Sequence, residues 1–451
     1  MSKKKKTIEK ILKESIISDE EQPYEVPENW VWMRFDSVIK TNSNRATAIK
    51  QANYEEEGEI PVIDQGMRLI SGFTNNQEHK YTGELPVIVF GDHTRCIKWI
   101  DFNFAQGADG TKLLKPLEHL YPKYFYYLLK TINLPNKGYS RHFKYLRDSV
   151  LPVPPLEEQK RIVGKVENFL KKIDEAKLLI EKTEESSKLR RSAIFNRAFS
   201  GDLTSEWRSE IYGEDSRETN KINSSDLPLN WRIVELREIL QMQNGLSKRK
   251  GENGKSIPVL RLSDIKGTKF NDSNLREIKL SEEEYRKYCL DLDDILFIRV
   301  NGSFDLVGKA IHFNLSHDAA FSDHLIRATF DKKLISASYL KYLFESSLVR
   351  DQLKGMIVSS AGQNTISQLS LGKIKIPLPP KKEMEQITNL LGKIFVKEEN
   401  ILSHLKDNIS QLHQMKQSVL LKAFKGELGT NILAEDNAIE FLTSSFQQQM
   451  N

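Results

Sequence analysis

The sequence has only two cysteines, Cys96 and Cys289, among its 451 residues. With so few, neither a disulfide framework nor a cysteine zinc site can be the basis of the fold. Long hydrophobic runs are also missing, since no stretch approaches the roughly 18 uninterrupted apolar residues that a membrane span needs. We therefore expect a cytoplasmic protein without membrane contact.

Signatures of catalysis are lacking as well. The GKS triplet at 254–256 resembles a phosphate loop, but Arg249 stands where that motif has its first glycine, and a strand-like IPVL follows. The nine histidines show no metal-ligand spacing. The DHTR segment at 92–95 has acid, histidine and hydroxyl groups, a combination far more typical of a polar loop than of a catalytic triad. We expect no catalytic residue, no metal site and no cofactor in this chain.

Neither sign of charge is in large excess. Lys and Arg number 67 against 62 Asp and Glu, which gives a formal net charge of +5 and a pI of about 8.8. Such a balance permits binding to a polyanion without requiring it. A hydrophobic content of 39% is enough for real cores. The length predicts two or three folded units.

What the sequence does have is an internal repeat. LPVPPLEEQKRI at 151–162 returns as IPLPPKKEMEQI at 376–387, and RSAIFNRAFSGDL at 191–203 returns as KQSVLLKAFKGEL at 416–428, both offset by 225 residues. Upstream, VPENWVWMRFDSVI at 26–39 returns as LPLNWRIVELREIL at 227–240, offset by 201 residues. The repeated plan is Pro-x-x-Trp, a variable domain, Pro-x-Pro-Pro, a long helix, and Ala-Phe-x-Gly-acid-Leu.

Between these motifs the two copies correspond more loosely. Residues 85–100 and 294–313 each show an apolar strand, a polar glycine-containing turn and a second strand. Residues 121–130 and 338–348 are aromatic-rich helical segments. Strands followed by a helix, with many short turns, predict a compact mixed α/β (α+β) domain in each copy.

A long helical pattern follows each Pro-x-Pro-Pro motif. Apolar residues recur at alternating steps of four and three, as in a coiled-coil seam. The predicted seam comprises Ile162, Val166, Phe169, Ile173, Ala176 and Ile180 in the first copy, and Ile387, Leu391, Ile394, Ile401, Leu405, Leu412, Met415 and Val419 in the second. Glu398 and Asn408 interrupt the second seam, and a buried Asn often fixes register. We expect an antiparallel coiled coil with approximate two-fold symmetry; the alternative is two ordinary helices, each packed on its own domain.

Several polar loops have the composition of nucleic-acid-binding segments. Cations alternate with aromatic rings at 138–147, and the loop at 244–255 is basic and glycine-rich; such cations contact phosphates. An adjacent Gln and Asn within 359–369 have amides suited to adenine edges. Each segment alone could be a solvated surface loop, but they recur at corresponding places in both copies. The residues that we expect to contact DNA are Asp92, His93, Thr94, Arg95, Arg141, His142, Lys144 and Arg147 in the first copy, and Lys248, Arg249, Arg299, Asn301, Ser303, Gln363 and Asn364 in the second.

The ordered, duplicated motif set resembles the DNA-specificity subunits of type I restriction-modification systems. The resemblance covers about residues 7–428 and depends on PENWVW at 27–32, LPVPPLEEQKRI, AFSGDL at 198–203, their second-copy counterparts, and DILFIRVNGSFDLVGKA at 294–310. It implies two target-recognition domains that each read half of a split site on double-stranded DNA, with two helices setting the spacing. It also implies docking of two modification (methyltransferase) subunits, which take S-adenosylmethionine, and two restriction subunits, which take ATP and Mg. The chain itself would be non-catalytic.

The resemblance suggests a division of the chain. We expect an N-terminal helical segment at 1–25, recognition domains at 26–155 and 227–380, coiled-coil helices at 156–200 and 381–428, a linker at 201–226 and a flexible tail at 429–451. Two departures from the pattern carry expectations of their own. KKEMEQ at 381–386 has two extra residues relative to LEEQ at 156–159, which predicts a shifted register in the second helix. NKGYSRHF in the first copy lacks the Gly-Gln step of the second, which predicts that the two halves grip DNA differently.

Two other hypotheses remain open at this point. One is an enzyme with a diverged site around Asp92 or Asp293 and Asp294. The other is a protein-binding scaffold that uses its coiled coil and ignores DNA.

Overall fold

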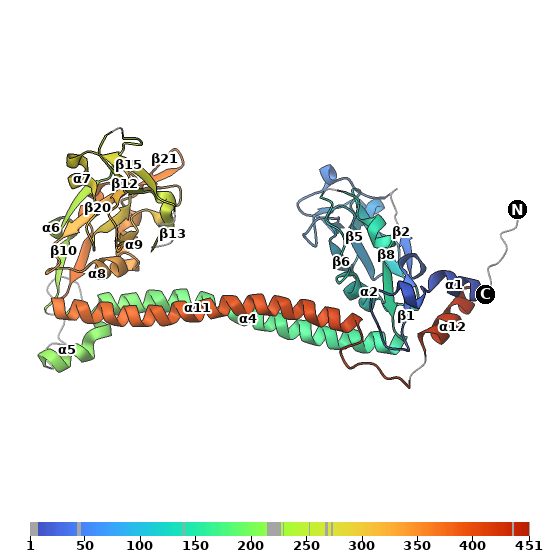
Figure 1. Cartoon of the computed structure of the whole chain (residues 1–451). Coiled ribbons are helices and arrows are strands. Elements are labelled where there is room, and N and C mark those ends of the chain that lie inside the picture. Colours follow the sequence, from blue (N-terminus) through green and yellow to red (C-terminus); the bar gives the residue numbers. More distant parts are fainter. Residues whose placement is uncertain are drawn as a thin grey trace. The chain divides into compact units, whose positions relative to one another are not determined.

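The chain forms two compact units, the first comprising Met1–Ile180 with Lys406–Asn451 and the second comprising Glu181–Leu405. The structure, a computed structural model, describes residues 8–42, 47–138, 140–213, 227–228, 230–251, 253–266, 269–271, 274–434 and 437–450. Residues 214–226 of the expected linker, and Tyr139, lie outside the described residues. Both unit boundaries fall within long helices, α4 (Leu156–Phe199) and α11 (Lys381–Phe424), so each unit holds the start of one helix and the end of the other (Figure 1).

Three small sheets build the domain of the first unit. β1 (Val31–Arg34) pairs antiparallel with β9 (Val150–Val153). A four-stranded antiparallel sheet has the order β2-β8-β5-β6 (Ile39–Asn42, Thr111–Pro116, Val87–Gly91, Ile97–Ile100). A three-stranded sheet has the order β4-β3-β7 (Gly72–Thr74, Ile60–Ile63, Ala105–Gln106), with β3 and β7 parallel. Among the described residues of this unit, the α-helices besides the long ones are α1 (Ile8–Ser15), α2 (Pro122–Leu129), α3 (Phe143–Arg147) and α12 (Ala438–Met450).

The domain of the second unit repeats this plan. β10 (Arg232–Glu235) pairs with β23 (Lys375–Leu378). The four-stranded sheet is β11-β20-β16-β18 (Leu240–Asn244, Leu325–Phe330, Ile295–Ile298, Ala310–His312), and the three-stranded sheet is β15-β12-β19 (Arg276–Leu280, Lys255–Leu260, Ala320–Phe321), with β12 and β19 parallel. Two further sheets are β17-β22-β21 (Val300–Asn301, Gln363–Thr365, Val358–Ser360) and β13-β14 (Ile265–Lys266, Lys269–Phe270). The shorter helices are α5 (Ser205–Tyr212), α6 (Leu236–Ile239), α7 (Glu282–Tyr288), α8 (Ala337–Leu343), α9 (Ser347–Lys354) and α10 (Gln368–Gly372). The predicted duplication of a mixed α/β domain is confirmed.

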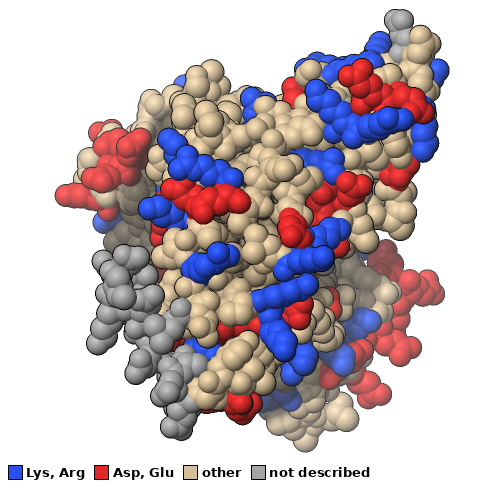
Figure 2. Space-filling view, turned by 90° about the vertical axis from the view of Figure 1, so that its left-hand side faces the viewer, with Lys and Arg blue, Asp and Glu red and all other residues tan. Residues whose placement is uncertain are grey.

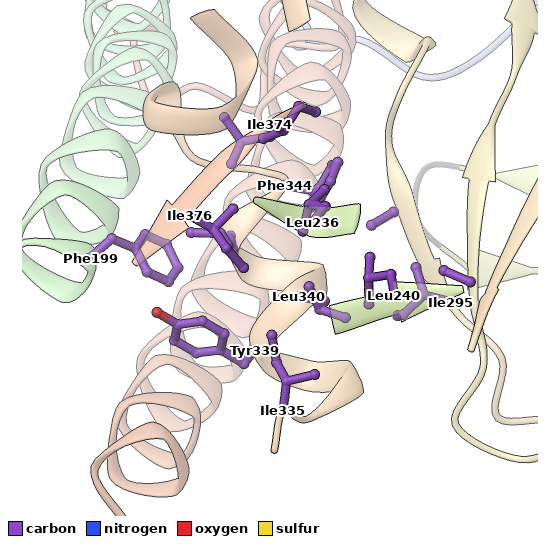
Figure 3. Close-up of a cluster of buried hydrophobic side chains, with 14 of the residues drawn as sticks. Phe199, Leu236, Leu240, Ile295, Ile335, Tyr339, Leu340, Phe344, Ile374 and Ile376 are labelled. Atoms are coloured by element: carbon purple, nitrogen blue, oxygen red, sulfur yellow. The ribbon is translucent and has the colours of Figure 1, made fainter. Parts of the chain in front are cut away.

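The Ala-Phe motif that ends each long helix is part of a domain core. Phe199 projects from α4 toward Tyr339 of α8 and Ile376 of β23 (Figure 3). The rings of Phe199 and Tyr339 meet edge to face, with centroids 5.5 Å apart. In the first unit, the rings of Phe424 and Tyr124 meet in the same way, 5.1 Å apart. Such contacts add about 0.5–1.5 kcal/mol to the burial of the rings, so each helix end is held firmly on a domain.

A buried carboxylate at the start of α11 ties this helix to the end of α4. Glu383 is fully buried. Its carboxylate accepts hydrogen bonds from the Trp231 indole (3.0 Å), the Thr204 hydroxyl (2.7 Å) and the Arg208 guanidinium (2.7 and 2.9 Å). Arg208 is itself almost fully buried. A charge in this environment is stable only with such partners, so these four residues form one interdependent group, the second anchor cluster.

The first unit holds the matching first anchor cluster at the start of α4. Glu158 is fully buried and accepts hydrogen bonds from the Trp30 indole (2.8 Å) and the Thr430 hydroxyl (3.4 Å). Glu158 and Glu383 are 225 residues apart, and Trp30 and Trp231 are 201 apart, which are the offsets of the repeated motifs. The boundary motifs of the sequence are therefore the parts of one interaction, built once in each unit.

The glycine of each Ala-Phe-x-Gly motif is required by geometry. Gly201 has φ +88°, and a Cβ there would lie 2.5 Å from the ring of Pro228. Gly426 has φ +76°, and a Cβ there would lie 2.5 Å from the ring of Pro27. Because only glycine adopts this conformation without strain and leaves room for the proline, the two motifs fit together.

The long helices run antiparallel within each unit. In the second unit, Ser187 donates to Glu398 (2.5 Å), and the rings of Phe195 and Phe395 lie 4.9 Å apart. In the first unit, Lys416 lies 3.7 Å from Asp174, and Lys165 donates to the Leu428 carbonyl (2.5 Å). Residue numbers rise along one helix as they fall along the other, as predicted.

The predicted seam is only partly buried. Ile162, Val166, Ile173, Ile180, Ile387 and Leu391 are buried, but Phe169, Ile401 and Met415 are exposed, the last two by more than half. A straight helix drifts relative to a 3.5-residue repeat, so the buried face moves off the predicted positions. Asn408 is exposed and does not fix register from within a core, whereas Glu398 is bonded to Ser187 and paired with Arg191.

The expected register shift of the second helix is wrong. α4 and α11 both contain 44 residues and begin 225 residues apart, at Leu156 and Lys381. The buried glutamates keep that offset, so KKEM corresponds to LEEQ without an insertion. The similarity of EEQ to MEQ suggests a different alignment, but the two fully buried glutamates, Glu158 and Glu383, are the residues that correspond.

Candidate nucleic-acid interface

The structure brings together the two segments of the first unit that we expect to contact DNA. The backbone carbonyl of Asp92 accepts a hydrogen bond from the His142 N–H (2.8 Å), and its carboxylate accepts one from the Phe143 N–H (2.8 Å). Asp92 and His142 are both buried. These hydrogen bonds hold the 92–95 turn against the start of α3, and the exposed neighbours of Asp92 and His142 are the groups available to a ligand.

The exposed cations of this region differ in how free they are. Arg141 and Lys144 are exposed, and the Lys144 ammonium lies 4.7 Å from the centre of the Tyr145 ring. Arg147 is held by Asp36, whose two carboxylate oxygens each lie 3.0 Å from its Nε, and this hydrogen bonding raises the pKa of Arg147. Arg141 and Lys144 are thus more available to a ligand than Arg147.

The 92–95 turn is organised by its own polar groups. The Thr94 hydroxyl donates to the Gln65 carbonyl (2.5 Å), and the His93 N–H donates to the Gln65 side chain (3.1 Å). Arg95 has φ +60° and donates to the Leu134 carbonyl (3.3 Å). A residue other than glycine at positive φ is uncommon, so the turn has a fixed shape.

The second unit joins the corresponding segments. The Arg299 carbonyl accepts from the Ile366 N–H (3.0 Å), as Asp92 does from His142. β17 pairs with β22, which sets Asn301 opposite Asn364. The Asn364 amide donates to the Gly302 carbonyl (3.0 Å), and its oxygen accepts from the Ser359 hydroxyl (2.5 Å). Asn364 therefore shapes the turn, and Ser303, whose N–H donates to the Asn301 side chain (2.8 Å), belongs to the same turn.

A tight hairpin carries Gln363. Ala361 and Gly362, between β21 and β22, have φ of +48° and +78°, the arrangement of a two-residue hairpin turn. The hairpin tip and Gln363 are exposed. An amide at the end of a stiff hairpin can approach base edges in a groove.

A basic hollow of about 270 Å³ lies on the second domain and includes residues that the sequence patterns did not indicate. The expected contacts Lys248 and Arg249 line it together with Arg261, Arg276 and His324. Arg299 donates to the Asp323 carbonyl (3.0 Å) beside it. The three additional residues lie in separate strands and loops, so no local motif reveals them; only the pairing of β12 with β15 and β19 brings them together.

Acidic side chains accompany the basic ones on this unit. On the face drawn in Figure 2, Lys and Arg side chains are interspersed with Asp and Glu. Lys248 itself pairs with Glu284 (3.0 Å), and a backbone hydrogen bond from Ser281 together with this ammonium lowers the pKa of Glu284. The face drawn in Figure 2 is therefore not uniformly basic.

Other kinds of site find little support in the described ranges. There, no three His, Cys, Asp or Glu side chains come together as a possible metal site. Among the described helices, none combines the length and the hydrophobicity that crossing a membrane requires. Asp293 pairs with His312 (2.8 Å) and Asp294 with Arg327 (2.6 Å).

The chain is similar to known proteins. A family model described as the type I restriction modification DNA specificity domain matches residues 27–185 and 228–411. The chain is 36% identical over 288 residues to the specificity subunit of the type I restriction enzyme StySPI of Salmonella potsdam, and 29% identical over 292 residues to that of EcoKI of Escherichia coli. Each match covers 63% of this chain and 59% of the relative, so the chain spans about three fifths of the length of these relatives.

The fold has a counterpart among solved structures. The HsdS subunit from Thermoanaerobacter tengcongensis is similar with a TM-score of 0.55 and 18% identity, over 90% of this chain and 100% of that one. This likeness concerns the fold alone. Because the family model matches well over half of the sequence, and does so once in each unit, this protein belongs to the type I restriction modification DNA specificity family.

Proposed function

We propose that this chain is the non-catalytic specificity subunit of a type I restriction-modification complex, in which each recognition domain reads one half of a bipartite site on double-stranded DNA. The observation that carries the proposal is the duplicated anchor cluster. A buried glutamate, an indole and a threonine recur in both units, while the exposed loops differ. Two domains that are anchored in the same way but have different exposed loops suit a DNA target with two different halves.

The proposed reading surfaces are the exposed parts of the two loop regions. In the first domain, within 26–155, we assign DNA contact to Arg141 and Lys144 and to the 92–95 turn. In the second domain, within 227–380, we assign it to Gln363 and to the 299–303 turn. Cations supply phosphate contacts, and amide or guanidinium groups can read base edges.

The long helices are proposed to set the gap between the half-sites. Each has 44 residues, hence a length of about 66 Å at about 1.5 Å per residue. DNA-binding dimers use such fixed separations to select half-site spacing. The helices would also dock two modification subunits, which take S-adenosylmethionine, and the complex would include two restriction subunits, which take ATP and Mg.

Methylation mapping tests the proposal. The purified chain should neither methylate nor cleave DNA, whereas the chain with its modification subunit should methylate a split motif with a fixed gap. Arg141→Ala should weaken selection at one half of that motif only, and Gln363→Ala at the other half only. Methylation by the chain alone, or a motif without two parts, would contradict the proposal.

A further inference from the structure

The basic hollow of the second domain contains two arginines that form no ion pair with another described residue. Three of its basic side chains lie beside an acidic partner: Lys248 beside Glu284 (3.0 Å), Arg261 beside Asp264 (2.8 Å) and His324 beside Asp323 (3.1 Å). Arg249 and Arg276 have no acidic partner among the described residues. Both line the hollow, which is large enough to admit a phosphodiester group.

The first domain offers a matched comparison, because its three-stranded sheet has the same register. Val62 faces Gly72 on β4 and Ala105 on β7. In the second domain, Val259 faces Arg276 on β15 and Ala320 on β19. Gly72 therefore occupies the position of Arg276.

Counting along the chain from these pairs gives the other counterparts. The parallel bridges of Ile49 with Gly107 and of Leu246 with Ser322 align the preceding loops, and Ile49 to Ile60 is as long as Leu246 to Ile257. Where the hollow has Lys248, Arg249, Arg261 and His324, the first domain has Gln51, Ala52, Asp64 and Asp109. Not one of the hollow's basic positions is basic in the first domain.

A tyrosine occupies the corresponding space in the first domain. A Cβ on Gly72 would lie 2.8 Å from the Cβ of Tyr54, and one on Gly107 would lie 2.6 Å from the Tyr54 hydroxyl. Burial, and then the charge of Asp64, raise the pKa of Tyr54, as expected for a ring packed over this edge. The residue at the position of Tyr54 in the second domain is Gly251. No ring stands there in the second domain: a Cβ on Gly251 would point at β15, 1.9 Å from the Lys279 carbonyl oxygen, and Val259, Arg276 and Ser322 line the hollow.

We propose that this hollow binds a phosphate of the DNA backbone through Arg249 and Arg276, and that the first domain makes no such contact at the corresponding place. This inference rests on the proposed function. The contact positions the second domain on the duplex and carries no sequence information itself. The two halves of the site therefore differ in how much of their binding depends on salt.

The test measures DNA affinity at several salt concentrations for the full chain assembled with its modification subunit. The duplexes are one that contains the methylated motif of this complex and one of unrelated sequence. Arg276→Gln removes one guanidinium, and Arg249→Ala installs the residue of the first domain. Each should weaken binding to both duplexes, by roughly tenfold at low salt, as the loss of one charge-assisted hydrogen bond does. The slope of log affinity against log salt should fall by about 1.

Arg232→Gln is the matched control, because Arg232 is an exposed arginine on β10 of the same domain but outside the hollow. It should leave affinity and slope unchanged. Unchanged binding in both hollow variants would overturn the inference, as would altered preference at one base pair with an unchanged slope, which would indicate base reading. If Arg276→Gln fails to fold, Arg249→Ala on an exposed loop still decides. A wild-type complex that does not prefer its own motif would instead count against the proposed function.

Discussion

The two domains are alike where they meet the long helices and different where they are exposed. In both units an indole and a threonine bind a buried glutamate, and a glycine packs against a proline ring. At the three-stranded sheets, by contrast, Tyr54 packs beside Gly72 in the first domain, whereas in the second domain Arg276 holds the position of Gly72 and lines a hollow. The comparison teaches that burial of a charge restricts residue choice far more than exposure at a strand edge does, because a buried carboxylate tolerates few partners.

Removal of one buried carboxylate is the substitution from which we expect the largest loss of stability. Glu383→Ala leaves Arg208 buried without its partner, which should cost about 3–5 kcal/mol in the free energy of unfolding. Denaturant unfolding gives the magnitude, and hydrogen exchange should locate the loss around α5 and β10.

Glu385→Ala is the control for that substitution, since Glu385 lies two residues further along the same helix and is exposed. Its effect should stay within about 0.5 kcal/mol. A similarly small loss in Glu383→Ala would show that the second anchor cluster does not hold the helix end.

The two domains should also differ in their response to acid. Burial lowers the pKa of His119 to about 4 from its ordinary 6.5. Below pH 6.5 the unfolded chain takes up a proton that the folded chain refuses, so the free energy of unfolding of the first unit falls as the pH drops toward 4. The loss approaches about 3 kcal/mol, at about 1.4 kcal/mol per pH unit.

The second domain has Leu334 at the corresponding position, five residues before the tyrosine that bonds a Pro-x-Pro-Pro carbonyl. His119→Leu should therefore flatten this dependence in urea titrations at pH 7 and pH 5. His413→Leu, which changes an exposed histidine of the same unit, should not alter it. An equal acid loss in wild type and His119→Leu would assign the effect to other groups.

Substituting the motif glycines tests whether the two units share one backbone requirement. Gly201→Ala and Gly426→Ala each force a methyl group toward a proline ring at positive φ, and each should cost about 2 kcal/mol. Gly429→Ala measures the backbone strain without a steric clash, because Gly429 has φ +65° but no atom within 4 Å of its Cβ position. It should cost about 1 kcal/mol. A large difference between Gly201→Ala and Gly426→Ala in thermal unfolding would break the equivalence of the two anchor clusters.

These residues also mark how far the sequence alone leads. The repeated motifs predict two domains and two long helices, because the constant spacing between motif copies can be seen directly in the sequence. The contact of Trp30 with Glu158 was not predicted, since it joins residues 128 apart and the acids at the helix start are equally well explained by the helix dipole. Lys248 and Arg249 were predicted from their basic loop, but Arg261, Arg276 and His324 were not, because strand pairing, and not proximity in the sequence, brings them beside that loop.

The smallest expected effect is the finest test of equivalence. The hydroxyl of Tyr124 donates to the Pro152 carbonyl and that of Tyr339 to the Pro377 carbonyl, both at 2.9 Å and both fully buried. Tyr124→Phe and Tyr339→Phe each leave one buried carbonyl without this donor, which should cost about 0.5–1.5 kcal/mol in each unit. Tyr145→Phe is the control, as its hydroxyl makes no hydrogen bond among the described residues. The two hydrogen bonds have the same length while the surrounding sequences differ. Losses in the free energy of unfolding that agree within about 0.5 kcal/mol would therefore mean that this contact contributes equally to both domains. A loss confined to one unit would mean that the repeat has diverged in its core as well as at its reading surfaces.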